Sequence, residues 1–271
     1  KPGIMQAYCS YQVCDPKGEL LRDCAPLLFQ RGYDVKMFNL KPGERRRTNA
    51  YNPFQYLRSD ADVIQMITLL FQATTPKNAH SSDPFWDRAE ELLVAALVLY
   101  LYHEGMEEDK NFATVMYLLN NAQASEEDEN FRNPVDDLFQ ELAFEKGEEN
   151  VAVQFYTAFK LAAGKTAKSV LIMATSRLRH FLLEEIAEMT STDEMDFASL
   201  GEHKRAIFIC TPVNDKSFNY LVSMLYMQAF QQLYDCAERK HGGTLPVHVR
   251  FLMDEFANVP VSEDFEQTLS T

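Results

Sequence analysis

The stretch "YCSYQVCDPKGELLRDCAPLLFQRGYDVKMFNL" at Tyr8 to Leu40 decides the fold class. It begins with a short run of strand-forming residues that ends at an Asp-Pro-Lys-Gly turn, because proline presets φ at the second turn position and glycine relieves the last. Apolar residues at helical spacing follow, with Pro26 predicted to kink the helix and Gly32 to end it. A second apolar run starts at Asp34. Strand, helix and strand in this order predict a βαβ unit of a parallel sheet.

The same alternation returns only near the other end of the chain. "RAIFIC" at Arg205 to Cys210 reads as a buried strand, and a long apolar-periodic helix follows it. Gly242 and Gly243 then break the helix before "VHVRFLM" at Val247 to Met253, which reads as another buried strand. These two stretches predict one α/β frame with a mainly parallel sheet.

Between the two stretches the apolar spacing is helical throughout. One example is the run from Phe85 to Tyr100, and another is "KSVLIMATSRLRHFLLEEIAEM" at 168–189, which predicts one long helix. The sequence therefore predicts an all-alpha domain inserted into an α/β domain. We expect the α/β domain at residues 1–75 and 201–271, and the helical domain at residues 76–200.

The composition is that of a folded protein, with 46% hydrophobic and 24% charged residues in 271. The longest apolar stretch, at Leu92 to Tyr102, is about half the ~20 residues that a membrane-spanning helix needs. The odd number of cysteines and the lack of a CxxC pair predict reduced thiols, and the scattered histidines predict no metal cage. The cysteines are Cys9, Cys14, Cys24, Cys210 and Cys236.

The net charge of −14 is unevenly distributed. Residues 83–200 contain 24 acidic and 9 basic side chains, whereas the rest of the chain contains 16 and 17. This acidic block predicts either solvated faces or a docking surface for a basic protein, and it disfavours direct DNA binding. The candidate docking residues are Glu107, Glu108, Asp109, Glu126, Glu127, Asp128, Glu129, Glu148 and Glu149.

Two stretches of the sequence have the basic residues of a possible anion-binding site. "LAAGKTAKS" at Leu161 to Ser169 contains the end of a phosphate-loop pattern, but Phe159 stands where the first glycine is needed, and an amphipathic helix precedes it. We therefore do not expect a nucleotide there. "KPGERRR" at Lys41 to Arg47 predicts a solvated loop, with a DNA or anionic-lipid contact as the alternative.

Two adjacent carboxylates, Asp254 and Glu255, follow the last predicted strand. At such a place in phosphate-loop ATPases the first acid helps to hold Mg²⁺, and the second polarises the water that attacks the γ-phosphate. The carboxyl end of a parallel strand is also where α/β proteins bind ligands. A solvated acidic turn is the alternative interpretation.

Several blocks in this order resemble the TraG-like type IV coupling proteins of conjugative transfer, in the version found in mobile elements of Gram-positive bacteria. The blocks are "CDPKGELLRD", "VKMFNL", "NAYNPFQYL", "DPFWDRAEELL", "AAGKTAKS", "FNYLVSMLYMQAF" and "LPVHVRFLMDEFANV". The resemblance implies a hexameric, membrane-anchored, RecA-like ATPase that uses ATP and Mg²⁺. It also implies a position at the cytoplasmic face of the bacterial membrane, docked on a type IV secretion channel.

The resemblance carries further expectations for the nucleotide site. In this family the phosphate loop lies just before the segment that matches "KPGIMQA", so we expect the chain to be a piece of a longer protein without its membrane helices. Alone, it is expected neither to bind nor to hydrolyse ATP, and to be a monomer or weak dimer. Asp15, Lys17 and Glu19 are expected near the nucleotide, with a plain β-turn as the alternative.

Three functions are compatible with these features. The first is an ATP-driven coupling protein that delivers single-stranded DNA and its attached relaxase, with the helical domain recognising the relaxase or accessory proteins. The second is a substrate receptor without significant nucleotide turnover. The third is a related DNA translocase, which the acidic insert disfavours.

Overall fold

The computed structural model describes residues 1–75, 84–125, 131–161, 164–212, 214–215 and 217–253. Packing divides the chain into two compact units, Lys1–Tyr56 with Glu188–Thr271, and Leu57–Ala187. The first unit contains a parallel sheet, and the described part of the second is helical. The predicted α/β class, with a helical domain inserted into it, is confirmed.

Both boundaries between the units lie earlier in the chain than predicted. They fall after Tyr56 and after Ala187, whereas the sequence predicted them after residues 75 and 200. Helix α3 (Asp60–Thr74) packs against α4 (Pro84–Glu104) and so joins the helical unit. At the other boundary, the 3₁₀ turn η4 (Phe197–Gly201) packs against the sheet and α10 (Asn219–His241) and so joins the sheet unit.

Four strands form the sheet, in the order β2-β3-β1-β4, and all neighbours are parallel. The strands are β1 (Ser10–Cys14), β2 (Asp34–Asn39), β3 (Arg205–Cys210) and β4 (Val249–Met253). Tyr11 of β1 lies opposite Ala206 of β3 and Arg250 of β4. Every residue of β1 and β3 is buried, as expected for apolar runs inside a parallel sheet.

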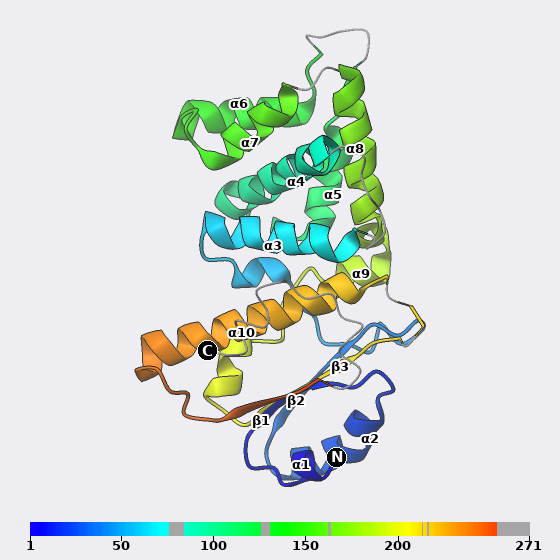
Figure 1. Cartoon of the computed structure of the whole chain (residues 1–271), viewed down its shortest axis with the longest axis vertical. Helices are drawn as coiled ribbons and strands as arrows, with labels where there is room; N and C mark the ends of the chain where they lie inside the picture. Colours follow the sequence, from blue (N-terminus) through cyan, green and yellow to red (C-terminus); the bar gives the residue numbers. More distant parts are fainter. Residues whose placement is uncertain (76–83, 126–130, 162–163, 213, 216, 254–271) are drawn as a thin grey trace. The chain divides into compact units, whose positions relative to one another are not determined.

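Helices cover both faces of this sheet (Figure 1). On one face α2 (Glu19–Gln30) and the short α1 (Pro2–Met5) cover a core that includes Tyr11 and Phe208. On the other face α10 stacks its Phe230 ring on Phe251 of β4, with the ring centroids 4.2 Å apart. Both helices end at glycine as predicted, because Gly32 and Gly242 adopt positive φ.

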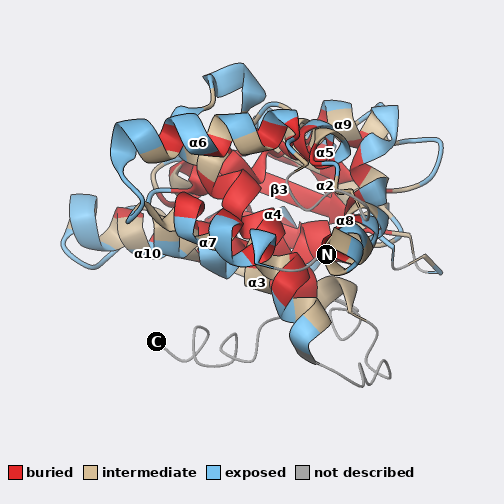
Figure 2. Cartoon of the chain, turned by 90° about the horizontal axis from the view of Figure 1, so that it is seen from above, coloured by how far each residue is buried: buried red, intermediate tan, exposed pale blue. Residues whose placement is uncertain are grey.

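The helical unit is built around α4, which contacts α3, α5, α7 and α8. Residues 93–99 of α4 are each at most 3% exposed, because this stretch is apolar on all sides and is surrounded by other helices (Figure 2). Among the described helices, none is both long and apolar enough to span a membrane. The remaining elements are η1 (Pro53–Tyr56), η2 (Glu107–Asp109), α5 (Phe112–Asn121), α6 (Pro134–Lys146), α7 (Val151–Lys160), α8 (Gly164–Leu178), η3 (Arg179–Leu182) and α9 (Glu184–Met189).

The single helix predicted over residues 168–189 is wrong. The chain forms α8, the 3₁₀ turn η3 and then α9, with Leu183 extended between the last two. The break lets Phe181 turn inward, where it is 1% exposed and stacks on Phe112 of α5 with ring centroids 4.4 Å apart. Tertiary packing therefore overrides helix propensity at this position.

Candidate functional sites at the sheet edge and in the helical unit

The carboxyl ends of three neighbouring strands meet at one edge of the sheet. Asn39 at the end of β2 lies opposite Cys210 at the end of β3, and Cys14 at the end of β1 lies opposite Ile209. The residues that follow these strands are therefore brought together at this edge, where open α/β sheets bind their ligands.

Asp15 is the first residue after β1, and its side chain is buried. One carboxylate oxygen, Oδ2, accepts a hydrogen bond from the backbone N–H of Leu21 (2.8 Å), in the first turn of α2. Its backbone oxygen accepts from the N–H of Gly18 (3.0 Å), closing the predicted turn. Asp15 thus anchors the start of α2 with one carboxylate oxygen, as an acidic side chain at a helix N-terminus does.

Lys41 follows β2 and lies beside the same turn. Gly18 has φ of +73°, and a Cβ added there would lie 3.1 Å from Lys41 Nζ and 3.9 Å from Cys210 Sγ. The turn therefore requires glycine both for its backbone conformation and for the approach of the lysine. Lys41 thus brings an ammonium group to the sheet edge, whereas the sequence predicted only a solvated basic loop for this residue.

The structure also places Lys17 and residues of the two basic motifs. Lys17 is exposed in the turn after β1. Arg45 stacks its guanidinium over the ring of Phe218 at 4.3 Å and donates from Nε to the backbone oxygen of Leu40 (3.1 Å), so this arginine of the basic loop is held against the fold. Gly164 opens α8, and the preceding element is helix α7.

Asp254 and Glu255 lie outside the described residues. They directly follow β4, whose last residue, Met253, lies opposite Cys14. Their assignment to magnesium and to the attacking water stays a prediction.

The predicted acidic docking residues fall in three places. Glu107, Glu108 and Asp109 form the exposed turn η2, where Glu107 pairs with Lys110 (2.7 Å). Glu148 and Glu149 are exposed in the turn between α6 and α7. The cluster at residues 126–129 lies outside the described residues.

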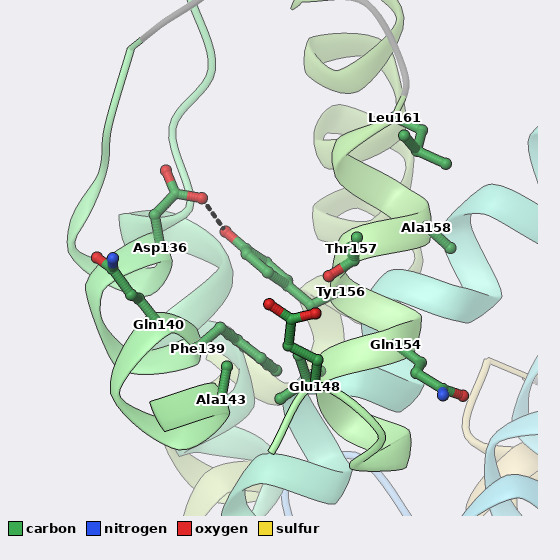
Figure 3. Close-up of a pocket in the computed structure, with 11 residues that line it drawn as sticks. Asp136, Phe139, Gln140, Ala143, Glu148, Gln154, Tyr156, Thr157, Ala158 and Leu161 are labelled. Atoms are coloured by element: carbon green, nitrogen blue, oxygen red, sulfur yellow. Dashed lines mark hydrogen bonds between the residues drawn. The ribbon is translucent and has the colours of Figure 1, made fainter. Parts of the chain in front are cut away.

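A pocket of about 540 Å³ lies between α6 and α7. Its floor contains the stacked rings of Phe139 and Tyr156, whose centroids are 4.0 Å apart. The Tyr156 hydroxyl donates to Asp136 Oδ1 (2.9 Å; Figure 3). Lys160 Nζ lies 2.9 Å from the same oxygen. Burial, together with the Asp136 carboxylate, raises the pKa of Tyr156 well above its ordinary range, so the hydroxyl keeps its proton and remains a donor.

Sequence reasoning missed this pocket. Tyr156 and Phe159 of α7 have the helical spacing of core residues in the sequence, and both are buried. The sequence feature that could have indicated the pocket is the apolar face of α7 directly after the acidic turn at Glu148, a residue that lines the pocket.

A further polar cluster lies where α10 ends. Glu202, Cys236 and His241 each offer one atom that could bind a metal ion, and these three atoms lie within 4.8 Å of one another. Glu202 Oε1 is 3.2 Å from both His241 Nε2 and Lys240 Nζ, and these hydrogen bonds hold the pKa of Glu202 below its usual range. Basic side chains at a helix C-terminus are favoured by the helix dipole. The contacts of Lys240 and His241 with Glu202 therefore explain this cluster without a metal ion.

The comparison with protein families gives one match. The family model for conjugative DNA transfer by the type IV secretory system matches residues 2–271. The chain belongs to this family. The search of curated proteins finds no match.

Solved structures similar to this member of the conjugative DNA transfer family have low sequence identity. One is the plasmid coupling protein TrwB in complex with ADP and Mg²⁺, with 15% identity, a TM-score of 0.49 and 99% of this chain covered. Another is TrwB in complex with a non-hydrolysable ATP analogue, with 14% identity, a TM-score of 0.47 and 99% of this chain covered. The chain spans about 61% of the first and 62% of the second.

Proposed function

We propose that this chain is the nucleotide-binding and substrate-recognition part of a TraG-like coupling protein, a hexameric RecA-like ATPase that drives the relaxase–DNA complex to a type IV secretion channel. The family match over residues 2–271 carries the proposal. The parallel sheet, interrupted in sequence by a helical unit, supports it, since the resemblance implies this organisation.

The proposed nucleotide site is the carboxyl edge of the sheet. Asp254 would help to hold the Mg²⁺ of the bound nucleotide, and Glu255 would orient and polarise the attacking water. The described part of this edge fits an anionic ligand, because the Lys41 ammonium and the turn after Asp15 lie there. Bound ATP would supply the phosphoryl group, and Mg²⁺ would neutralise the negative charge that develops on it. Asp15 and Lys17 are proposed to lie near the nucleotide, with the role of Asp15 limited by its bond to α2.

The helical unit is proposed to recognise protein substrates, namely the relaxase and its accessory DNA-processing proteins. Its sequence has a strong excess of acidic residues, and charge complementarity sets encounter rate and register with a basic partner. We place the assembled protein at the cytoplasmic face of the bacterial membrane, in contact with single-stranded DNA and the channel proteins.

The test is ATP hydrolysis by the complete cytoplasmic protein, with and without single-stranded DNA. Glu255→Gln is expected to lower the DNA-stimulated rate at least about 100-fold, the size of effect typical for a lost general base. Glu238→Gln, an exposed residue of α10, is the matched control and is expected to retain the rate. A rate that survives in Glu255→Gln contradicts the assigned role.

The receptor function is the alternative favoured by the acidic helical unit and its pocket. It predicts that the complete protein captures the relaxase but hydrolyses no ATP, even with DNA and partner proteins present. A DNA translocase unrelated to conjugation predicts DNA-stimulated hydrolysis without relaxase capture.

A further inference from the structure

The pocket between α6 and α7 combines an apolar interior with open access. Figure 3 shows the Tyr156 ring extending from α7 towards α6, with Leu161 at the far end of α7. Leu161 is 83% exposed, and the small side chains of Ala143 and Ala158 leave the space between the helices unfilled. The volume of about 540 Å³ lies within the range of about 300–1,000 Å³ typical of ligand pockets.

The surroundings of this pocket are strongly acidic. Residues 134–150 contain six acidic side chains and one basic side chain, Lys146. Lys146 forms an ion pair with Glu104 of α4 (3.4 Å), a carboxylate outside this segment. Glu141, Glu145, Glu148 and Glu149 are all exposed, and Glu148 lines the pocket itself.

The Asp136 carboxylate, which lines the pocket, has several hydrogen-bond and ion-pair partners. Asp136 accepts from Tyr156 and from the backbone N–H of Asn133 (2.9 Å), and it pairs with Lys160. Asn133 in turn caps α6 through a capping box. An entering group therefore meets apolar surface in the interior and the exposed Glu148 carboxylate at the rim, which disfavours an anionic occupant.

We propose that this pocket docks a basic amphipathic helix of a substrate protein, which inserts one or two large aliphatic side chains between α6 and α7. An amphipathic helix laid into an apolar groove presents its anchors at helical spacing, and its cationic face then meets the acidic rim. The inference rests on the proposed role of the helical unit in substrate recognition and names the surface and the chemistry of the partner.

The test is a fluorescence anisotropy titration of the 271-residue chain with two labelled helical peptides. Both carry the same lysines on one face, and the other face carries either leucine or alanine. The leucine peptide is expected to bind at least about 10-fold more tightly than the alanine peptide, because buried aliphatic anchors are worth about 1.4 kcal/mol or more. Equal affinities, or no binding of the leucine peptide, would overturn the proposal.

A substitution that fills the pocket distinguishes binding of the aliphatic side chains in the pocket from general electrostatic attraction to the acidic surface. Ala158→Trp, on an exposed position that lines the pocket, is expected to abolish the difference between the two peptides. Ala61→Trp, on an exposed position of α3, is the matched control and is expected to preserve it. A leucine preference that persists in Ala158→Trp places the docking site elsewhere, provided that circular dichroism shows the variant folded.

The rim charge is tested independently of the anchor. Glu148→Lys is expected to weaken both peptides by a similar factor, with a reduced dependence on salt, whereas Glu238→Lys on α10 leaves the binding of both unchanged. Equal effects of the two substitutions would contradict a local role for the rim. These outcomes are separate from ATP hydrolysis, so failure of the motor would not imply failure of the pocket.

Discussion

Arg177 of α8 and Glu90 of α4 form a two-pronged ion pair inside the helical unit. Arg177 Nε lies 2.7 Å from Glu90 Oε1, and Nη2 lies 3.0 Å from Oε2. The Glu90 side chain is 1% exposed, and the guanidinium also stacks over Phe71 of α3 at 4.4 Å. One arginine thus joins α3, α4 and α8.

Removing the arginine alone is expected to destabilise the helical unit severely. Arg177→Met would leave the Glu90 carboxylate buried and unpaired, which costs about 3–5 kcal/mol of the free energy of unfolding. The double variant Arg177→Met with Glu90→Leu is expected to lose less than the single variant, because it buries no charge. Urea unfolding followed by circular dichroism measures both.

Arg179→Met is the control for this comparison, because Arg179 is exposed on the adjacent turn. It is expected to change the free energy of unfolding by no more than about 0.5 kcal/mol. If Arg177→Met behaves like this control, the ion pair contributes little to stability.

The sheet unit is expected to show a pH dependence that comes from Asp193. Burial raises the pKa of Asp193 above its ordinary 3.8, even though the Tyr56 hydroxyl donates to it at 2.5 Å. The folded state therefore holds this proton more tightly than the unfolded state. The contribution of Asp193 to stability is present below about pH 3.8 and is lost as the pH rises through the raised value.

The measurement is the free energy of unfolding at several pH values, compared with Asp193→Asn. The difference between the protein and this variant is expected to shift in favour of the variant as the pH rises. Glu238→Gln provides the comparison for loss of an exposed carboxylate. A difference that is independent of pH would contradict the raised pKa.

The cysteines are expected to react slowly in the folded chain. All five are buried and none forms a disulfide. Burial raises the pKa of Cys210 to about 12, so its reactive thiolate is scarce near neutral pH. Alkylation of Cys210 near pH 8, followed by peptide mass spectrometry, should be about 1,000-fold slower in the folded than in the unfolded chain. Fast modification under native conditions would show that this thiol is accessible.

The sheet elements were predictable because their signals are local. The strand before Asp15, the end of α2 at Gly32 and the end of α10 at Gly242 follow from apolar runs and from residues that tolerate positive φ. The break near Phe181 was not predictable in this way, because it depends on the Phe112 ring, about 70 residues earlier in the chain.

The candidate sites divide along the same line. Asp15 could be placed at the sheet edge, because the carboxyl end of a strand is visible in the sequence. Lys41 beside Gly18 and the pocket between α6 and α7 could not, because each depends on how separate segments approach one another. The spacing of residues along the chain does not indicate which separate segments come into contact.

The order of the strands has a consequence for how the chain is made. Strand β1 is paired on both sides with strands that are synthesised after the whole helical unit, since Tyr11 lies between Ala206 and Arg250. At about 5–20 residues per second, the ribosome needs on the order of ten seconds or more to reach those partners. The first segment of the sheet unit, Lys1–Tyr56, is therefore made before the strands that pair with β1, and the helical unit emerges between them.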